Sequence, residues 1–214
     1  MTQSKMTHGH AHCPHPVPCP ENAPCRLCRI EVDKLSVTMG KQVLLKDVSL
    51  HIHCGELTAL IGTNGAGKTT LLRALLGQVE YKGTVRHLTS DGRPAADLRT
   101  GYVPQQLEFD RSSPVTVMDF VAAALTPQPD LLILDEPVSG VDQNGLEAFY
   151  QTVDELKHKN HMAILLVSHD LGVVEHYADR VVLMQGTVIK QGSPEVVFDS
   201  PEFEQVFYAK GGRA

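Results

Sequence analysis

The feature that most constrains the fold is a glycine-rich loop of eight residues. Its sequence, Gly62-Thr63-Asn64-Gly65-Ala66-Gly67-Lys68-Thr69, fits the pattern G-x-x-x-x-G-K-[ST]. An apolar run at 57–61 precedes the loop, and a run with helical character at 71–76 follows it. A loop between a buried strand and a helix can wrap around phosphates with its N–H groups pointing inward, and the helix N-terminus adds partial positive charge. The sequence therefore predicts a phosphate-binding α/β domain.

The loop assigns roles to individual residues. Lys68 can reach the β- and γ-phosphates of a nucleotide, and the Thr69 hydroxyl can bind Mg²⁺. The residues expected to surround the phosphates are Gly62, Thr63, Asn64, Gly65, Ala66, Gly67, Lys68, Thr69 and Thr70.

A second motif ends an apolar run at 131–134 with two carboxylates, Asp135 and Glu136. Ligands of open α/β sheets bind at the carboxyl ends of the strands. We expect Asp135 to hold Mg²⁺, directly or through water. We expect Glu136 to polarise the water that attacks the γ-phosphate.

The remaining patterns predict the fold class. Apolar and polar residues alternate at 30–38 and 43–53, as in half-buried strands. The nearly continuous apolar runs at 57–61, 131–134, 163–167 and 181–184 are typical of a parallel sheet covered on both faces. Helical spacing at 144–159, after the expected cap Asp142, and a hairpin at 180–190 complete the pattern. We expect an α/β fold with a mostly parallel sheet flanked by helices and an N-terminal antiparallel β-subdomain.

Taken with their neighbours, these motifs resemble the ATP-binding subunits of ABC transporters, from about residue 29 to about residue 208. The segments 102–105, 139–142 and 166–170 resemble the Q-loop, D-loop and H-loop of that family. The resemblance implies a P-loop NTPase core, ATP hydrolysis, and ATP and Mg²⁺ as cofactors. It assigns catalytic roles to Glu136, His169 and Gln105, and it implies that Thr69, Gln105 and Asp135 hold the Mg²⁺.

The same resemblance implies a transmembrane permease and a second ATP-binding subunit as partners. The chain would then lie in the cytoplasm, peripherally on the inner face of the cell membrane. The net charge of −6 argues against a basic face for nucleic acid. The apolar runs are too short to span a bilayer, and no charged start followed by an apolar segment indicates a secretory signal.

The chain departs from the family pattern in one large respect. The family places a helical subdomain between the Q-loop and the acidic strand, and that subdomain ends in the signature Leu-Ser-Gly-Gly-Gln or a close variant. No such sequence occurs here, and only 30 positions separate Gln105 from Asp135. The two ends of the subdomain are joined near 121–124, so we expect a truncated helical subdomain. A smaller departure is Met39, which stands where the family often has an aromatic residue that stacks on adenine.

The first 28 residues differ from the rest of the chain. Five prolines between Pro14 and Pro24 exclude a regular helix, so we expect residues 1–28 to be a disordered, extended His/Cys/Pro-rich tail and the ATP-binding domain to cover 29–214. Imidazole and thiolate together suit Zn²⁺. The candidate zinc ligands are His8, His10, His12, Cys13, His15, Cys19, Cys25 and Cys28.

Three functions remain open at this point. The first is the ATP-binding subunit of a metal importer, since the segments 55–62 and 192–197 resemble the zinc- and manganese-type group. The second is a truncated, catalytically impaired nucleotide-binding protein that lacks the signature. The third is a His/Cys-rich metal-binding module on an ATP-binding scaffold.

Overall fold

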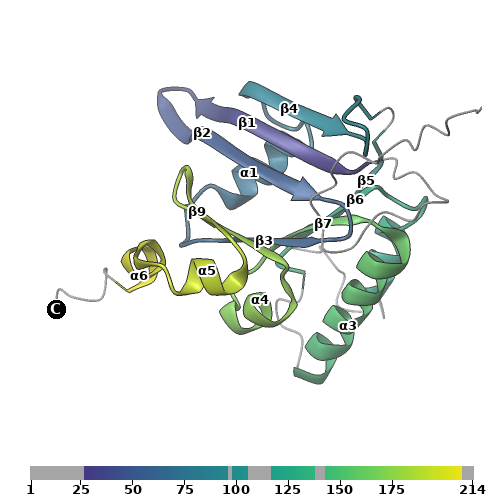
Figure 1. The fold of residues 1–214 in the computed structure, drawn as a ribbon. Helices are drawn as coiled ribbons and strands as arrows, with labels where there is room; N and C mark the ends of the chain where they lie inside the picture. Colours follow the sequence, from purple (N-terminus) through teal and green to yellow (C-terminus); the bar gives the residue numbers. More distant parts are fainter. Residues whose placement is uncertain (1–26, 96–97, 106–116, 138–142, 209–214) are drawn as a thin grey trace, which may run out of the picture.

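The computed structural model describes residues 27–95, 98–105, 117–137 and 143–208. Two sheets form its framework, one of three strands and one of six (Figure 1). Within the described residues, no helix is long and apolar enough to cross a membrane.

The smaller sheet is antiparallel, with strand order β2-β1-β4. Its strands are β1 (Arg29–Met39), β2 (Gln42–His53) and β4 (Lys82–Leu88). Buried residues alternate with exposed or half-buried ones along much of β1 and β2, as the sequence predicts for strands with one face on a core. Register shifts after Val32 and Leu35 interrupt that alternation.

The larger sheet has the order β5-β6-β7-β3-β8-β9. Its strands are β3 (Leu57–Ile61), β5 (Thr100–Val103), β6 (Leu131–Asp135), β7 (Ala163–Val167), β8 (Arg180–Met184) and β9 (Val188–Gly192). The first five strands in this order are parallel, and β9 pairs with β8 as an antiparallel hairpin. Every residue of β3, β6 and β7 is buried, because layers cover both faces.

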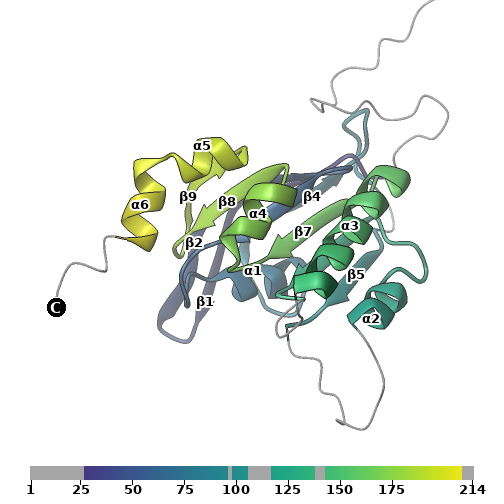
Figure 2. The same ribbon diagram turned by 90° about the horizontal axis from the view of Figure 1, so that it is seen from below.

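Helices complete these layers. They are α1 (Lys68–Leu75), α2 (Val117–Ala124), α3 (Gln143–Asn160), α4 (Leu171–Tyr177), α5 (Pro194–Phe198) and α6 (Pro201–Phe207). One core lies between the large sheet and the layer formed by the small sheet and α1. The other joins the large sheet to α3, α4, α5 and α6, and Figure 2 shows α3 and α4 across that face.

The predicted fold class is confirmed, and several elements are additional to the prediction. Strands β4 and β5 and helices α4 and α6 were not anticipated, since their sequences are short or weakly periodic. Helix α2 is the one helix between β5 and β6 among the residues described there. The proposed cap Asp142 lies outside the described residues.

The folded part begins earlier than the predicted boundary after residue 28. Leu27 and Cys28 are both buried. The Cys28 N–H donates to the Leu88 carbonyl at 2.7 Å, and the Cys28 carbonyl accepts from the Cys54 N–H at 2.9 Å. Cys28 therefore belongs to the folded domain and not to the tail, because β2 and the end of β4 continue the ladder beyond Arg29.

Candidate nucleotide site

The glycine-rich loop connects β3 to α1, as predicted, and is held tightly by its neighbours. Gly67 caps α1 with φ of 92°, and a Cβ placed there would lie 2.4 Å from Leu45 Cδ2 on β2. A Cβ at Gly62 would lie 2.3 Å from the Met184 carbonyl oxygen on β8. Gly62 requires glycine because a side chain would overlap the β8 backbone, and Gly67 requires it because a φ of 92° is strained for any residue with a side chain.

The Lys68 ammonium lies inside the curve of this loop. Its Nζ donates to the Gly62 carbonyl at 2.7 Å and to the Thr63 carbonyl at 3.3 Å. Burial lowers the pKa of Lys68, while the charges of Glu136 and Asp135 act in the opposite direction. Within the loop, the direct partners of the Lys68 ammonium are two neutral carbonyl groups. Charged phosphate oxygens would be stronger partners, so the ammonium can exchange the carbonyls for them.

Asp135 is the last residue of β6 and is 2% exposed. Its Oδ1 is buried and accepts no hydrogen bond from any residue that the structure describes. Burial raises the pKa of Asp135 and the charge of Glu136 raises it further, whereas Lys68 and Arg73 lower it. A buried carboxylate oxygen without a donor, at the carboxyl end of a strand beside the loop, suits a hard cation such as Mg²⁺.

Glu136, Gln105 and His169 come together at the ends of three adjacent strands. Gln105 follows β5 and its Nε2 donates to Glu136 Oε2 at 2.8 Å. His169 follows β7, and its Nδ1 lies 3.2 Å from the same oxygen. Glu136 has φ of 49°, an uncommon value for a residue with a side chain, and its N–H donates to the Val167 carbonyl. Strand order β5-β6-β7 thus collects the three predicted catalytic residues around one carboxylate oxygen.

The beginning of β2 borders the same loop. Val43 is 58% exposed and Met39 is 60% exposed. Leu44 O would lie 3.4 Å from a Cβ at Gly67, so this end of β2 is next to the glycine loop. Val43 was missed by the sequence reasoning, although an apolar residue on the exposed face of a strand was the available signal.

The other predicted residues are placed as follows. Thr69 and Thr70 lie in the first turn of α1. Arg73 lies one turn further along α1 and lowers the pKa of Asp135 by its charge. The sequence reasoning missed this residue. Its spacing of four residues from Thr69, which puts both on one face of the helix, was the available signal. The D-loop segment 139–142 and all tail ligands before Cys28 lie outside the described residues. Within the described residues, no group of three or more His, Cys, Asp or Glu is placed to hold a metal.

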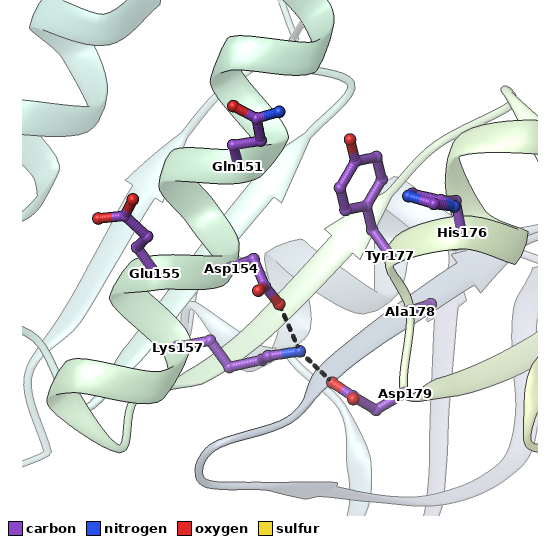
Figure 3. A pocket seen from close by; sticks show the side chains of 8 residues that line it. All are labelled: Gln151, Asp154, Glu155, Lys157, His176, Tyr177, Ala178 and Asp179. Carbon is purple, nitrogen blue, oxygen red and sulfur yellow. Dashed lines mark hydrogen bonds and ion pairs between the residues drawn. The ribbon is translucent and has the colours of Figure 1, made fainter.

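A separate pocket of about 520 Å³ lies between α3 and α4 (Figure 3). Lys157 Nζ lies 2.9 Å from both Asp154 Oδ1 and Asp179 Oδ2. Burial opposes the charge of Lys157, but hydrogen bonds to Asp179 and Asp154 outweigh it and raise the pKa of Lys157. Asp179 Oδ2 also accepts from the Leu57 N–H at 2.7 Å, at the amino end of β3. This pocket is therefore at the opposite end of the sheet from the glycine loop.

Comparisons with known proteins agree with this arrangement. The family model of the ABC transporter matches residues 45–119. The zinc import ATP-binding protein ZnuC of Roseobacter denitrificans is 34% identical over 220 positions, covering 83% of this chain and 84% of that protein. The ZnuC of Cereibacter sphaeroides is 36% identical over 220 positions, covering 83% and 88%. A solved ATP-binding cassette of an ABC transporter in its ADP conformation has the same fold, with a TM-score of 0.70, 17% identity and coverage of 86% and 98%.

The alignment also contains a large gap. Since 83% of 214 residues is about 178, about 42 of the 220 aligned positions of the Roseobacter protein have no counterpart in this chain. The match to the family model ends at Asp119, within α2.

Proposed function

This chain belongs to the ATP-binding subunits of ABC transporters, and from that premise we propose that it powers an importer of zinc or manganese. The observation that carries the nucleotide part is the convergence of Gln105, Glu136 and His169 beside the glycine loop. The metal part is supported by relatives that are zinc import proteins. Zinc is therefore the first choice of substrate.

In this proposal each residue of the site has a distinct task. Lys68 leaves the carbonyls of Gly62 and Thr63 and binds the β- and γ-phosphates. Glu136 accepts a hydrogen bond from the attacking water and orients it toward the γ-phosphate. Gln105 and His169 hold the Glu136 carboxylate, since both contact its Oε2. Val43 and Met39 offer an apolar surface for the base.

The residues present fit a Mg²⁺ ion. Asp135 and Thr69 would hold it, with Gln105 as a further oxygen donor, and Asp135 Oδ1 is the buried oxygen that such an ion would satisfy. When bound, Mg²⁺ neutralises charge on the phosphate oxygens as it develops.

We further propose that the His/Cys-rich tail binds Zn²⁺. Four histidines and three cysteines lie before residue 28, and their imidazole and thiol groups are zinc ligands. The tail would bind zinc next to the subunit that drives its import.

The proposed partners follow from the family. A transmembrane permease would hold the chain on the inner face of the cell membrane, and a second ATP-binding subunit would face its glycine loop. We place the join in the helical subdomain near Val121–Ala124, where the chain passes from α2 into the segment leading to β6. A partner with a complete helical subdomain would supply the signature that this sequence lacks.

The proposed function can be tested by uptake of radioactive zinc in the cells that encode this chain. Lys68→Ala should weaken Mg-ATP binding by about 1–3 kcal/mol, the scale of a charge-assisted hydrogen bond to a desolvated partner. Zinc uptake should then fall to the level of cells without the gene. Lys190→Ala is the matched control, because Lys190 is a partly exposed lysine on β9 that bonds Glu202.

Three outcomes separate the parts of the proposal. Loss of manganese uptake with unchanged zinc uptake would change the substrate to manganese. Unchanged uptake of both metals in Lys68→Ala would contradict the transport function. Equal Mg-ATP affinity in the wild type and Lys68→Ala would contradict the nucleotide site itself.

A further inference from the structure

Tyr150 on α3 carries a buried hydroxyl group. The residue is 1% exposed, and its Oη forms no hydrogen bond of regular geometry with any residue that the structure describes. The ring stacks on Tyr177 of α4 with centroids 5.1 Å apart, and it meets the ring of Phe149 edge to face, also at 5.1 Å. These contacts hold the Tyr150 ring between α3 and α4 (Figure 2), so the hydroxyl cannot turn outward to water.

A buried hydroxyl without a hydrogen bond destabilises a fold. Phenylalanine would fill the same space without that cost, because it has no polar group to desolvate. Most buried polar groups in native proteins have a partner, and the exceptions occur where a functional state of the protein uses the group. The Tyr150 hydroxyl therefore indicates a second state in which it is paired.

The polar neighbour of this hydroxyl is Ser168, the residue before His169. Burial raises the pKa of Tyr150, the neighbouring Ser168 hydroxyl lowers it, and the charge of Asp170 raises it. Ser168 is 6% exposed, and its Oγ accepts from the Asp170 N–H at 3.1 Å. A serine hydroxyl has one proton and two lone pairs, so Ser168 Oγ can pair with Tyr150 Oη as well.

The turn that contains Ser168 determines where His169 lies. Strand β7 ends at Val167, and Asp170 caps α4 by accepting at 3.2 Å from a backbone N–H of that helix. Only Ser168 and His169 lie between these two fixed points. The His169 side chain is 70% exposed, and its Nδ1 lies 3.2 Å from Glu136 Oε2. Since little packing holds this imidazole, the backbone of the turn sets its direction.

We propose that Tyr150 is a positioning residue for ATP hydrolysis: when nucleotide binds, Tyr150 Oη pairs with Ser168 Oγ and thereby fixes His169 relative to Glu136. This inference rests on the proposed ATP-driven function and adds to the site a residue of α3 that touches neither nucleotide nor Mg²⁺. Because Tyr150 and Ser168 are already neighbours, the new hydrogen bond requires only a local shift of the turn.

The test compares Tyr150→Phe, which removes only the hydroxyl, with Tyr177→Phe, which removes the hydroxyl of the stacked ring. Tyr177 lines the pocket between α3 and α4 and is not part of the nucleotide site (Figure 3). In thermal unfolding without nucleotide, Tyr150→Phe should have the Tm of the wild type or a higher one, because the hydroxyl is unpaired in that state.

The functional readout is the NMR signal of the His169 ring, assigned with His169→Ala. Mg-ATP should shift this signal in the wild type and in Tyr177→Phe, and the shift should be smaller in Tyr150→Phe. The Mg-ATP affinity of Tyr150→Phe should stay at the wild-type value, since Lys68 holds the phosphates. Zinc uptake by cells that carry Tyr150→Phe should fall roughly 2–10-fold, the factor that corresponds to one neutral hydrogen bond.

The outcomes separate this inference from the function on which it rests. A wild-type response of His169 to Mg-ATP in Tyr150→Phe, with the response lost in Lys68→Ala, would overturn the inference and leave the nucleotide site standing. A Tm of Tyr150→Phe below those of the wild type and Tyr177→Phe would also refute it, since the hydroxyl would then stabilise the nucleotide-free fold. No effect of Mg-ATP on His169 in the wild type would contradict both the inference and the proposed function.

Discussion

Asp135 lies in an energetically costly environment in the nucleotide-free protein. Its carboxylate is buried at the end of β6, one oxygen has no donor among the described residues, and Glu136 adds a like charge next to it. A buried charge without full hydrogen bonding destabilises a fold. The protein tolerates this because Mg²⁺ and nucleotide would use that same oxygen.

We therefore expect Asp135→Asn to stabilise the nucleotide-free protein by about 1 kcal/mol. The substitution removes a desolvated negative charge, and the asparagine side chain has nearly the same shape as the aspartate it replaces. For a chain of this size that corresponds to a rise of about 2–4 °C in Tm. The same variant should lose the Mg²⁺-dependent part of ATP binding. Calorimetry with and without Mg-ATP measures both effects, and Asp33→Asn, on an exposed carboxylate, is the control.

The pH dependence has a definite sign. The pKa of Asp135 is raised in the folded state, so the folded protein keeps this proton to higher pH than the unfolded chain does. The free energy of unfolding therefore falls as pH rises from the ordinary value of 3.8 through the raised pKa. The fall in the free energy of unfolding with rising pH should be smaller in Asp135→Asn than in the wild type. If the Tm of Asp135→Asn at neutral pH is lower than the Tm of the wild type, the argument is contradicted.

At the scale of elements, the glycine loop is shaped by the strands on either side of it. The Gly186 N–H donates to the Ala66 carbonyl and the Lys46 N–H donates to the Gly186 carbonyl, so the loop, the β8–β9 turn and β2 form one connected unit. The loop therefore depends on backbone approaches that no side chain can replace.

Gly62→Ala should destabilise the protein by more than the roughly 1–3 kcal/mol of a strained backbone residue, because its Cβ would also overlap the Met184 carbonyl. Gly65→Ala is the matched control. Gly65 also has positive φ, but a Cβ there meets nothing within 4 Å. Denaturant unfolding and ATP titration of both variants should show the larger loss for Gly62→Ala. Equal losses of stability in the two variants would show that the positive φ alone, and not the overlap with Met184, determines the requirement for glycine.

At the other end of the sheet, Asp179 connects α3 to the core strands by neutralising Lys157 and accepting from the Leu57 N–H. Asp179→Ala should lower the free energy of unfolding by about 1–3 kcal/mol, because it leaves a buried ammonium and a backbone N–H short of an acceptor. Gln151→Ala, on the exposed rim of the same pocket, should change it by less than about 0.5 kcal/mol. Thermal unfolding compares the two, and an equal response would refute the role of Asp179.

At the scale of the whole molecule, the gap between β5 and β6 decides what the isolated chain can do. In the family to which it belongs, two ATP-binding subunits pair head to tail, and the signature of one completes the phosphate site of the other. The sequence contains the glycine loop, the acidic pair and the residues that contact Glu136, but not the signature.

We expect the isolated chain to bind ATP and to hydrolyse it slowly. Loss of a single positioned donor costs about 10²–10³-fold in rate, and a signature segment contributes several donors. Steady-state phosphate release should therefore be close to that of Glu136→Gln, which lacks the proposed base, and ATP should not induce dimers. Insertion of a helical subdomain with its signature between Val121 and Ala124 should restore both. Turnover of the native chain far above the Glu136→Gln blank would show that another segment completes the site.

The local motifs were predictable from the sequence because each is a short chain segment whose chemistry needs no distant partner. The glycine loop is recognised from the succession of a strand, a turn and the start of a helix. Strand β6 is recognised from an apolar run that ends in a carboxylate. Helix α3 and the β8–β9 hairpin were found for the same reason. Short elements such as α4 were missed, since seven residues give too little periodicity to distinguish a helix from a loop.

The sequence by itself determined which groups are available for chemistry: the loop, Asp135 and Glu136, Gln105, His169 and the cysteines. Only the tertiary structure decided which of them touch. Gln105 and His169 reach one oxygen of Glu136 because β5 and β7 flank β6, and the Cys54 N–H bonds the Cys28 carbonyl because β2 pairs with β1 in one particular register. Strand neighbours and register depend on how distant apolar faces pack together. That packing is a property of the whole core, and no local pattern of residues records it.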